Sequence, residues 1–242
     1  MPKNHTIVCF GDSITKGYTP FLENELKKTR YSNYKVINEG IDGNTSRDAL
    51  ERLNDVVAHN PEIVILSFGM NDSARDSNIS FEEYTGNMSK LIQELRKNEI
   101  ETMILTVSPK AFTEHKNKIN EIIEGKYGIK TIVSSINGAN KNINKINEIL
   151  KELSFSEKVK IININYFWKL TFRNGKDGLK DDIHPNERGN KLFAEVISKH
   201  LRRRSQIILW QYNGDPCECN YACPYCPADP RKQKGHYFKG TI

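Results

Sequence analysis

Long apolar runs are absent from this 242-residue sequence, so none of its segments is expected to cross a membrane. Residues 1–5 contain no apolar signal region and lead straight into a strand-like segment, which indicates a cytoplasmic protein. Tandem repeats are absent as well, which argues against a repeat architecture. Cysteine is scarce before residue 217, where only Cys9 occurs, in an apolar segment that suits a small core residue.

Net charge is also low over most of the chain. The total is +6, but residues 202–242 hold seven Lys or Arg and only three acids. The basic excess therefore belongs mainly to the C-terminal segment and predicts no nucleic-acid surface on the rest of the chain. The length suits one good-sized domain, or one domain plus a fragment.

The sequence does contain a regular alternation of strand-like and helix-like segments. Short apolar runs predict strands at residues 6–10, 34–38, 63–68, 102–107 and 159–164. Apolar residues at helical spacing, with cap signals, predict helices from the Thr19-Pro20 pair, over 45–59, after Ser80, from 140, and over 185–203. This alternation predicts an α/β fold, with a parallel sheet of about five strands between two layers of helices.

Residues 108–139 are less regular than the rest of the chain and follow the fourth predicted strand. They are expected to contain a short helix near 116–124 and to form a loop over the active face.

Polar side chains follow the predicted strands, at the edge where open α/β sheets bind ligands. Ser13, Gly43 and Asn71 follow the first three strands, and Asp181 and His184 precede the last helix. A serine hydroxyl needs a base within hydrogen-bond reach, and histidine has a pKa suited to that task. A carboxylate can orient the imidazole, while backbone N–H groups and an amide can bind an oxyanion. Together these residue types are what acyl transfer requires.

Four motifs resemble those of the SGNH (GDSL-type) hydrolase family. In chain order they are Gly11-Asp12-Ser13, Asn38-x4-Gly43-x-Thr45, Gly69-x-Asn71-Asp72 and Asp181-x2-His184-Pro185-Asn186-x2-Gly189. Each motif is common alone, but four in the family's order at strand ends are specific, and they cover nearly all of residues 5–204. Ile14 stands where the family usually has Leu, a conservative difference. The chain also lacks the G-x-S-x-G elbow of α/β-hydrolases, as the family does.

The resemblance implies a flavodoxin-like three-layer α/β/α sandwich for residues 1–204 and a role for each matching residue. Ser13 would be the nucleophile, His184 the general base and Asp181 the residue that orients His184. The oxyanion hole would consist of the Ser13 N–H, the Gly43 N–H and the Asn71 side chain. The hydrolysis would need no cofactor or metal. The family's substrates include acyl esters, lysophospholipids, thioesters and acetylated sugars.

Other polar residues near these motifs are assigned structural roles. Asp12 and Asp72 are predicted to stabilise loops through hydrogen bonds to backbone groups. Asp182 could compete with Asp181 for the imidazole, although the i, i+3 spacing favours Asp181. Arg47 is interpreted as a surface residue rather than as a contact for an anionic substrate group.

Residues 205–242 differ from the rest of the chain. A strand-like run at 206–210 precedes Cys219-x3-Cys223-x2-Cys226, which resembles the opening of a radical SAM domain. That resemblance implies that Cys219, Cys223 and Cys226 bind a four-iron four-sulfur cluster, whose remaining iron holds S-adenosylmethionine. The chain stops soon after Cys226, so we interpret the segment as the truncated start of a second domain. A zinc site with Cys217 or His236 as fourth ligand, and a disordered remnant, are the alternatives.

The sequence therefore predicts a serine esterase, lipase-like in family, that cleaves a small-molecule ester through an acyl-enzyme. Two other hypotheses stay open. One is an accessory domain of a radical SAM enzyme, and the other is a non-catalytic SGNH-like binding module, against which the intact motif residues argue. The sequence does not indicate which ester is cleaved or what the oligomeric state is.

Overall fold

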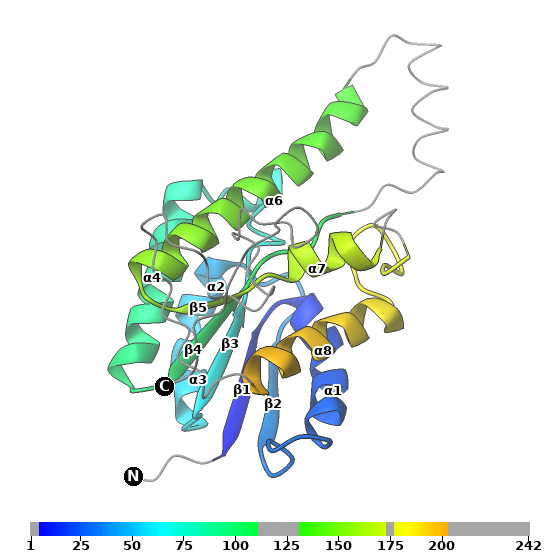
Figure 1. Cartoon of the computed structure of the whole chain (residues 1–242). Helices are drawn as coiled ribbons and strands as arrows, with labels where there is room; N and C mark the ends of the chain where they lie inside the picture. Colours follow the sequence, from blue (N-terminus) through cyan, green and yellow to red (C-terminus); the bar gives the residue numbers. More distant parts are fainter. Residues whose placement is uncertain (1–4, 111–130, 173–176, 203–242) are drawn as a thin grey trace, which may run out of the picture.

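The computed structural model describes residues 5–110, 131–172 and 177–202 (Figure 1). At its centre lies a five-stranded sheet with the strand order β2-β1-β3-β4-β5, in which every neighbouring pair is parallel. The strands are β1 (Thr6–Gly11), β2 (Lys35–Gly40), β3 (Ile63–Ser67), β4 (Glu101–Leu105) and β5 (Lys160–Ile162). The predicted parallel sheet of about five strands is thereby confirmed.

Helices cover both faces of the sheet, as the three-layer prediction required (Figure 1). On one face α1 packs against α8, and on the other α4 packs against α2 and α6. The helices are α1 (Ser13–Leu26), α2 (Ser46–Glu51), α3 (Leu53–Ala58), α4 (Phe81–Lys97), α6 (Thr131–Ser156), α7 (Ile164–Thr171) and α8 (Glu187–Arg202), with a 3-10 turn, η1 (Arg75–Ser77). Among the described residues, no helix is long and apolar enough to span a bilayer.

The core lies between the sheet and these two helical layers. All six residues of β1 are buried, which explains why its sequence is continuously apolar rather than alternating. Trp168 of α7 and Phe172 just beyond it are also buried, with ring centroids 4.8 Å apart. Trp168 also meets the Phe193 ring of α8 edge-on at 6.1 Å, so these aromatic residues belong to the core.

The first helix begins earlier than the sequence predicted. Asp12 caps α1 by accepting the Ile14 N–H at 2.9 Å, so the Thr19-Pro20 pair lies inside the helix rather than at its start. Pro20 has no N–H to donate to the Lys16 carbonyl one turn earlier. The Asn38 side chain donates to that carbonyl instead, at 3.2 Å. A tertiary contact therefore compensates for the proline, which local sequence rules could not anticipate.

Two further predictions about the helices were wrong in detail. The single helix expected over residues 45–59 is split into α2 and α3, because Arg52 has a non-helical backbone with φ −108° and ψ 15°. In addition, no helix was predicted over α7. Asn163 directly follows β5 and caps α7, where its Oδ1 accepts the Tyr166 N–H at 2.8 Å.

The boundaries around residues 108–139 also differ from expectation. Helix α6 starts at Thr131, earlier than the predicted start at 140. The short helix predicted near 116–124 lies outside the described residues.

Candidate active site

Four loops meet at the carboxyl edge of the sheet, which is the upper edge in Figure 1. Three of them follow β1, β2 and β3, and the fourth precedes α8. Parallel strands place their carboxyl ends at one edge, so residues far apart in sequence come together there. The structure brings Ser13 and His184 into contact across 171 positions of sequence.

Ser13, His184 and Asp181 form a continuous chain of hydrogen bonds. Ser13 Oγ lies 3.0 Å from His184 Nε2, and His184 Nδ1 lies 2.9 Å from Asp181 Oδ2. Both distances are within the range for a nucleophile, a base and an orienting group. The sequence-predicted residues thus have the mutual geometry that their predicted roles require.

The base comes from a short loop that is held mainly by local bonds. Asp181 Oδ1 accepts the backbone N–H of Ile183 at 2.8 Å and that of His184 at 2.7 Å. The loop is closed by the Lys180 N–H, which donates to the His184 carbonyl at 2.9 Å. The side chains of His184 and Asp181 are 37% and 49% exposed, so this part of the site faces solvent.

The same contacts determine the charge state of Asp181. Partial burial by itself would raise the pKa of this carboxyl, but the N–H bonds from His184 and Ile183, together with the imidazole, outweigh burial and lower it. Asp181 is therefore a carboxylate at neutral pH. A carboxylate there can accept a hydrogen bond from a His184 Nδ1–H, and the imidazole tautomer with that hydrogen can accept a proton at Nε2.

The predicted oxyanion donors follow the first three strands. Gly43 has φ +80°, a conformation that favours glycine, and its N–H has no hydrogen-bond acceptor in the described part of the chain. Asn71 Nδ2 donates to the Asn44 carbonyl at 2.8 Å. Because an amide nitrogen carries two hydrogens, this bond orients Asn71 and leaves one N–H for an oxyanion. The Ser13 N–H lies at the start of α1, where backbone N–H groups favour negative charge.

Two buried carboxyl groups support these loops from below. Asp12 caps α1, and Asp72 Oδ1 accepts the Ser46 N–H of α2 at 2.9 Å. Burial raises the pKa of Asp12 to about 7 and also raises the pKa of Asp72. Their bonds to backbone groups agree with the structural roles predicted for both residues.

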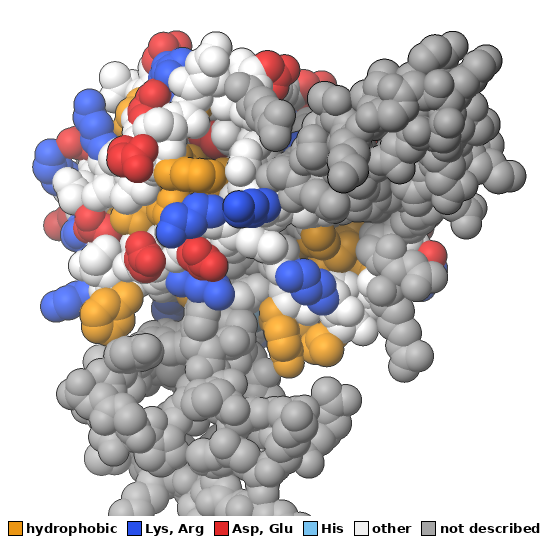
Figure 2. Space-filling model, turned by 90° about the horizontal axis from the view of Figure 1, so that it is seen from above, with side chains coloured by type: hydrophobic (Ala, Val, Ile, Leu, Met, Phe, Trp, Pro, Cys, Tyr) orange, Lys and Arg blue, Asp and Glu red, His pale blue; other side chains and the backbone are white. Residues whose placement is uncertain are grey.

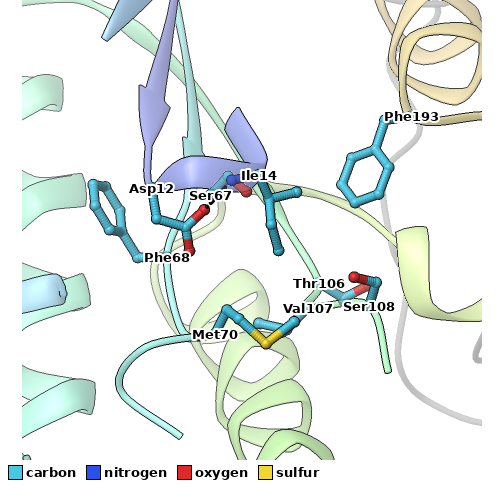
Figure 3. Close-up of a pocket in the computed structure, with 9 residues that line it drawn as sticks. All are labelled: Asp12, Ile14, Ser67, Phe68, Met70, Thr106, Val107, Ser108 and Phe193. Carbon is cyan, nitrogen blue, oxygen red and sulfur yellow. Dashed lines mark hydrogen bonds between the residues drawn. The ribbon is translucent and has the colours of Figure 1, made fainter. Parts of the chain in front are cut away.

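A small cavity lies on the inner side of the Ser13 turn. Figure 3 shows Asp12 and Ile14, which flank Ser13, facing Met70, Val107 and other lining residues. Its volume is about 10 Å³, near the lower limit for one water molecule. It is too small for an acyl group, so it does not provide an acyl-binding pocket.

Arg47 is committed to an ion pair. Its guanidinium donates to both carboxylate oxygens of Glu83, at 2.8 and 2.9 Å, which supports the surface interpretation. The Ser80 hydroxyl caps α4 by accepting the Glu83 N–H at 3.1 Å. The Glu83 carboxylate binds Arg47 instead of completing a capping box with the Ser80 N–H.

The described part of the carboxyl edge carries charges of both signs. Figure 2 views the molecule from this side, and Lys, Arg, Asp and Glu side chains are interspersed over the described part of the face, with small hydrophobic areas between them. Such a mixed surface does not produce a strong long-range field of either sign.

One important residue was missed by the sequence analysis. Arg52, at the break between α2 and α3, donates hydrogen bonds to Gly11, Glu39 and Asn44. Nothing in the sequence around Arg52 distinguishes it from an ordinary surface arginine. Only its contacts with distant segments show that it matters to the site.

The predicted metal ligands cannot be placed. Cys219, Cys223 and Cys226 lie outside the described residues. Within residues 5–110, 131–172 and 177–202, no group of three or more His, Cys, Asp or Glu side chains could hold a metal ion. Cys9 is in the core as predicted, and burial raises the pKa of its thiol to about 12, so it stays protonated.

Comparison with known proteins gives matches in both sequence and fold. Residues 9–192 match the model of the GDSL-like lipase/acylhydrolase family. An uncharacterized lipoprotein of Bacillus subtilis, YqeF, is 29% identical over 162 residues, which cover 61% of this chain and 65% of that protein. The chain thus spans a little less than two thirds of this curated relative.

Solved structures share the fold. A lipase/acylhydrolase from Enterococcus faecalis superposes with a TM-score of 0.64 and 24% identity, covering 82% of this chain and 96% of that chain. The acetylxylan esterase Axe2 from Geobacillus stearothermophilus superposes with a TM-score of 0.66 and 17% identity, covering 82% and 94%. At such identities the likeness establishes the fold, not the substrate.

Proposed function

This chain belongs to the GDSL-like lipase/acylhydrolase family, and from that premise we propose that it is a serine esterase whose acyl-enzyme forms on Ser13. The observation that carries the proposal is the unbroken series of contacts from Ser13 Oγ to His184 Nε2, 3.0 Å, and from His184 Nδ1 to Asp181, 2.9 Å. A binding module would have no need of this series, which is why we favour catalysis over the non-catalytic alternative.

In the acylation step, His184 Nε2 takes the proton of the Ser13 hydroxyl as its oxygen attacks the ester carbonyl. The carbonyl becomes a tetrahedral oxyanion, and the His184 imidazolium is stabilised by the Asp181 carboxylate. His184 then gives the proton to the leaving alkoxide oxygen, which departs as the alcohol. In deacylation a water loses its proton to His184, attacks the acyl-enzyme, and releases the acid and the Ser13 hydroxyl.

Both steps form an oxyanion that the candidate donors would stabilise. The proposed donors are the Ser13 N–H, the Gly43 N–H and the second hydrogen of Asn71 Nδ2. These groups are held in place before reaction, so they stabilise the developing charge without the cost of reorienting solvent.

Short acyl esters are the first substrates to test. An acetylxylan esterase is among the similar structures, which supports this choice. We propose that the enzyme accepts acetyl esters, including acetylated sugars, more readily than long-chain esters.

The test is hydrolysis of p-nitrophenyl acetate, butyrate and decanoate, together with an acetylated xylo-oligosaccharide, by the parent chain and by Ser13→Ala. We expect Ser13-dependent hydrolysis that decreases with acyl length. Hydrolysis by Ser13→Ala at the parent's rate would refute the esterase, and a preference for decanoate would refute only the substrate assignment.

The C-terminal segment carries a separate proposal. The spacing of Cys219, Cys223 and Cys226 favours an iron–sulfur site of the radical SAM type beside the esterase domain. Anaerobic reconstitution with iron and sulfide, followed by iron counting on the full natural chain, tests it. Four irons per chain would support the cluster, whereas zinc or no metal would refute it. The cytoplasmic location likewise stays a prediction.

A further inference from the structure

Arg52 connects three segments that surround the candidate oxyanion hole. Its Nη2 donates to the carbonyl oxygens of Gly11 and Glu39, each at 2.9 Å. Its Nε donates to Asn44 Oδ1 at 2.7 Å. Gly11 is two residues before Ser13, and Asn44 directly follows Gly43. One guanidinium therefore bridges the strand that presents the nucleophile and the loop that presents an oxyanion donor.

An aromatic ring and a carboxylate also contact the Arg52 guanidinium. It lies over the ring of the buried Phe10, with Cζ 4.5 Å from the ring centroid, and its Nη1 approaches Glu39 Oε2 at 3.4 Å. Glu39 is also bonded by His59, whose Nε2 lies 2.8 Å from Glu39 Oε1. The Arg52 side chain is only 13% exposed, so water competes little for the groups that make these contacts.

The Asn44 peptide extends this connection to Asn71. The Asn44 carbonyl accepts the bond from Asn71 Nδ2 that orients its amide. Arg52 holds the side chain of the same Asn44, so displacement of Arg52 releases a residue in contact with one donor and adjacent to the other. None of the Arg52 contacts involves Ser13 Oγ, His184 or Asp181, so its effect on the base would be indirect.

We propose that Arg52 is a positioning residue that keeps the Gly43 and Asn71 donors in register with Ser13. The inference rests on the proposed esterase function. Lysine cannot replace Arg52, because a single ammonium cannot donate in a planar fork to two carbonyls and a side-chain oxygen at once. Loss of register weakens transition-state stabilisation more than substrate binding, so kcat should fall while KM changes little.

Arg30 offers a matched control at the opposite end of the fold. It too is an arginine beside an aromatic ring, with Cζ 5.2 Å from the Tyr31 ring centroid, and it donates to the Arg202 carbonyl at 2.9 Å. Its contacts with Tyr31, Leu201 and Arg202 lie away from the site. Arg30→Lys therefore shows what an arginine-to-lysine change does at an exposed site away from the oxyanion loop.

The experiment compares kcat and KM for p-nitrophenyl acetate in the parent, Arg52→Lys, Arg30→Lys and Ser13→Ala. We expect Arg52→Lys to lower kcat by about 10–100-fold with KM within about threefold, and Arg30→Lys to leave both within about twofold. Equal kcat losses in the two lysine variants would overturn the positioning role. Parent activity no higher than that of Ser13→Ala would instead overturn the esterase proposal, and the inference with it.

A double-mutant cycle provides a readout that a purely structural role would not change. Asn71→Ala removes one donor, so the kcat loss caused by Arg52→Lys should be at least about threefold smaller in the Asn71→Ala background than in the parent. Additive losses would contradict the inference. If Arg52→Lys does not fold, Asn44→Ala replaces it, since it removes only the Nε contact. Asn44→Ala should show the same kcat-only loss and the same non-additivity, and its failure to do so would overturn the proposal.

Discussion

The two sides of the candidate site are built in opposite ways. The nucleophile and oxyanion side joins β1, the loop after β2 and the loop after β3 through Asp72 and Arg52, while the buried Asp12 caps α1. The base side is one loop before α8, in which Asp181 bonds residues two and three positions away and remains about half exposed. The candidate oxyanion donors are thus held by contacts between segments, and the candidate base by a local turn.

Because of this difference, mutations on the two sides should differ in how much they affect catalysis and how much they affect stability. Changes on the base side should alter catalysis while leaving the free energy of unfolding nearly unchanged, because few buried contacts are lost. Changes on the oxyanion side should alter stability as well, because Asp72 and Arg52 there connect separate segments. The following predictions test that separation, beginning with the largest expected effect.

Ser13→Ala and His184→Ala should each lower kcat by about 10³-fold or more, because the nucleophile and its base act as one unit. The double variant should be little worse than either single variant. Steady-state hydrolysis of p-nitrophenyl acetate measures the loss, and thermal unfolding should show a small change for His184→Ala. If the kcat loss of the double variant equalled the product of the two single losses, the two residues would not act in the same step.

Asp181→Asn should lower kcat by about 10²–10⁴-fold, since the amide cannot stabilise the His184 imidazolium and can impose the wrong tautomer. Asp182→Asn is the matched control, because the imidazole bonds of His184 go to Asp181, and it should change kcat only slightly. The pH profile of kcat/KM measured on both variants checks the assignment. A larger loss of kcat in Asp182→Asn than in Asp181→Asn would assign the orienting role to Asp182 instead.

Gly40→Ala should destabilise the oxyanion side. A Cβ at Gly40 would collide with the backbone N of Lys16 and approach the Asp12 carbonyl at 2.8 Å, where β2 packs against the start of α1. The expected cost is about 2–4 kcal/mol. Gly86→Ala is the control, because it lies in the exposed face of α4 with open space around it, and should stabilise by about 0.5–1 kcal/mol. Urea unfolding measures the change in the free energy of unfolding for each variant. Equal changes would contradict the close packing of Gly40 against α1.

Asp12→Asn should make unfolding less sensitive to pH. Burial raises the pKa of folded Asp12 from 3.8 to about 7. A raised carboxyl pKa means that the folded state holds its proton more tightly, so ionisation destabilises the fold as pH rises from about 4 to 7. Asparagine avoids that penalty, which amounts to at most roughly 4 kcal/mol.

The stability of Asp12→Asn relative to the parent should therefore increase over that pH range and level off above it. Urea unfolding of both proteins from pH 4 to pH 8 measures the difference. A difference that is constant with pH, or that shrinks as pH rises, would contradict a buried, ionising Asp12.

The same contrast explains what could be predicted from the sequence. Asp181 and His184 lie three positions apart, so their relation is readable in a local motif, and the strand alternation indicates which loops share an edge. Arg52 is different, because its role depends on contacts 8, 13 and 41 positions away in sequence. The position of Pro20 inside α1 likewise depends on Asn38, a donor from another segment. Local patterns predicted the alternation of strands and helices apart from α7, and they singled out Ser13, Asp181 and His184, but they did not predict the buried contacts between segments.

The central claim is that Ser13 is a nucleophile activated by His184, and covalent labelling by a fluorophosphonate tests it most directly. The chain, Ser13→Ala and His184→Ala are treated with the probe, and intact mass and peptide mapping follow the adduct. We predict one adduct per parent chain, mapped to Ser13, none on Ser13→Ala, and labelling of His184→Ala slower by about 10²-fold or more. Labelling of Ser13→Ala at the parent's rate, or an adduct mapped to another residue of the parent, would contradict the claim.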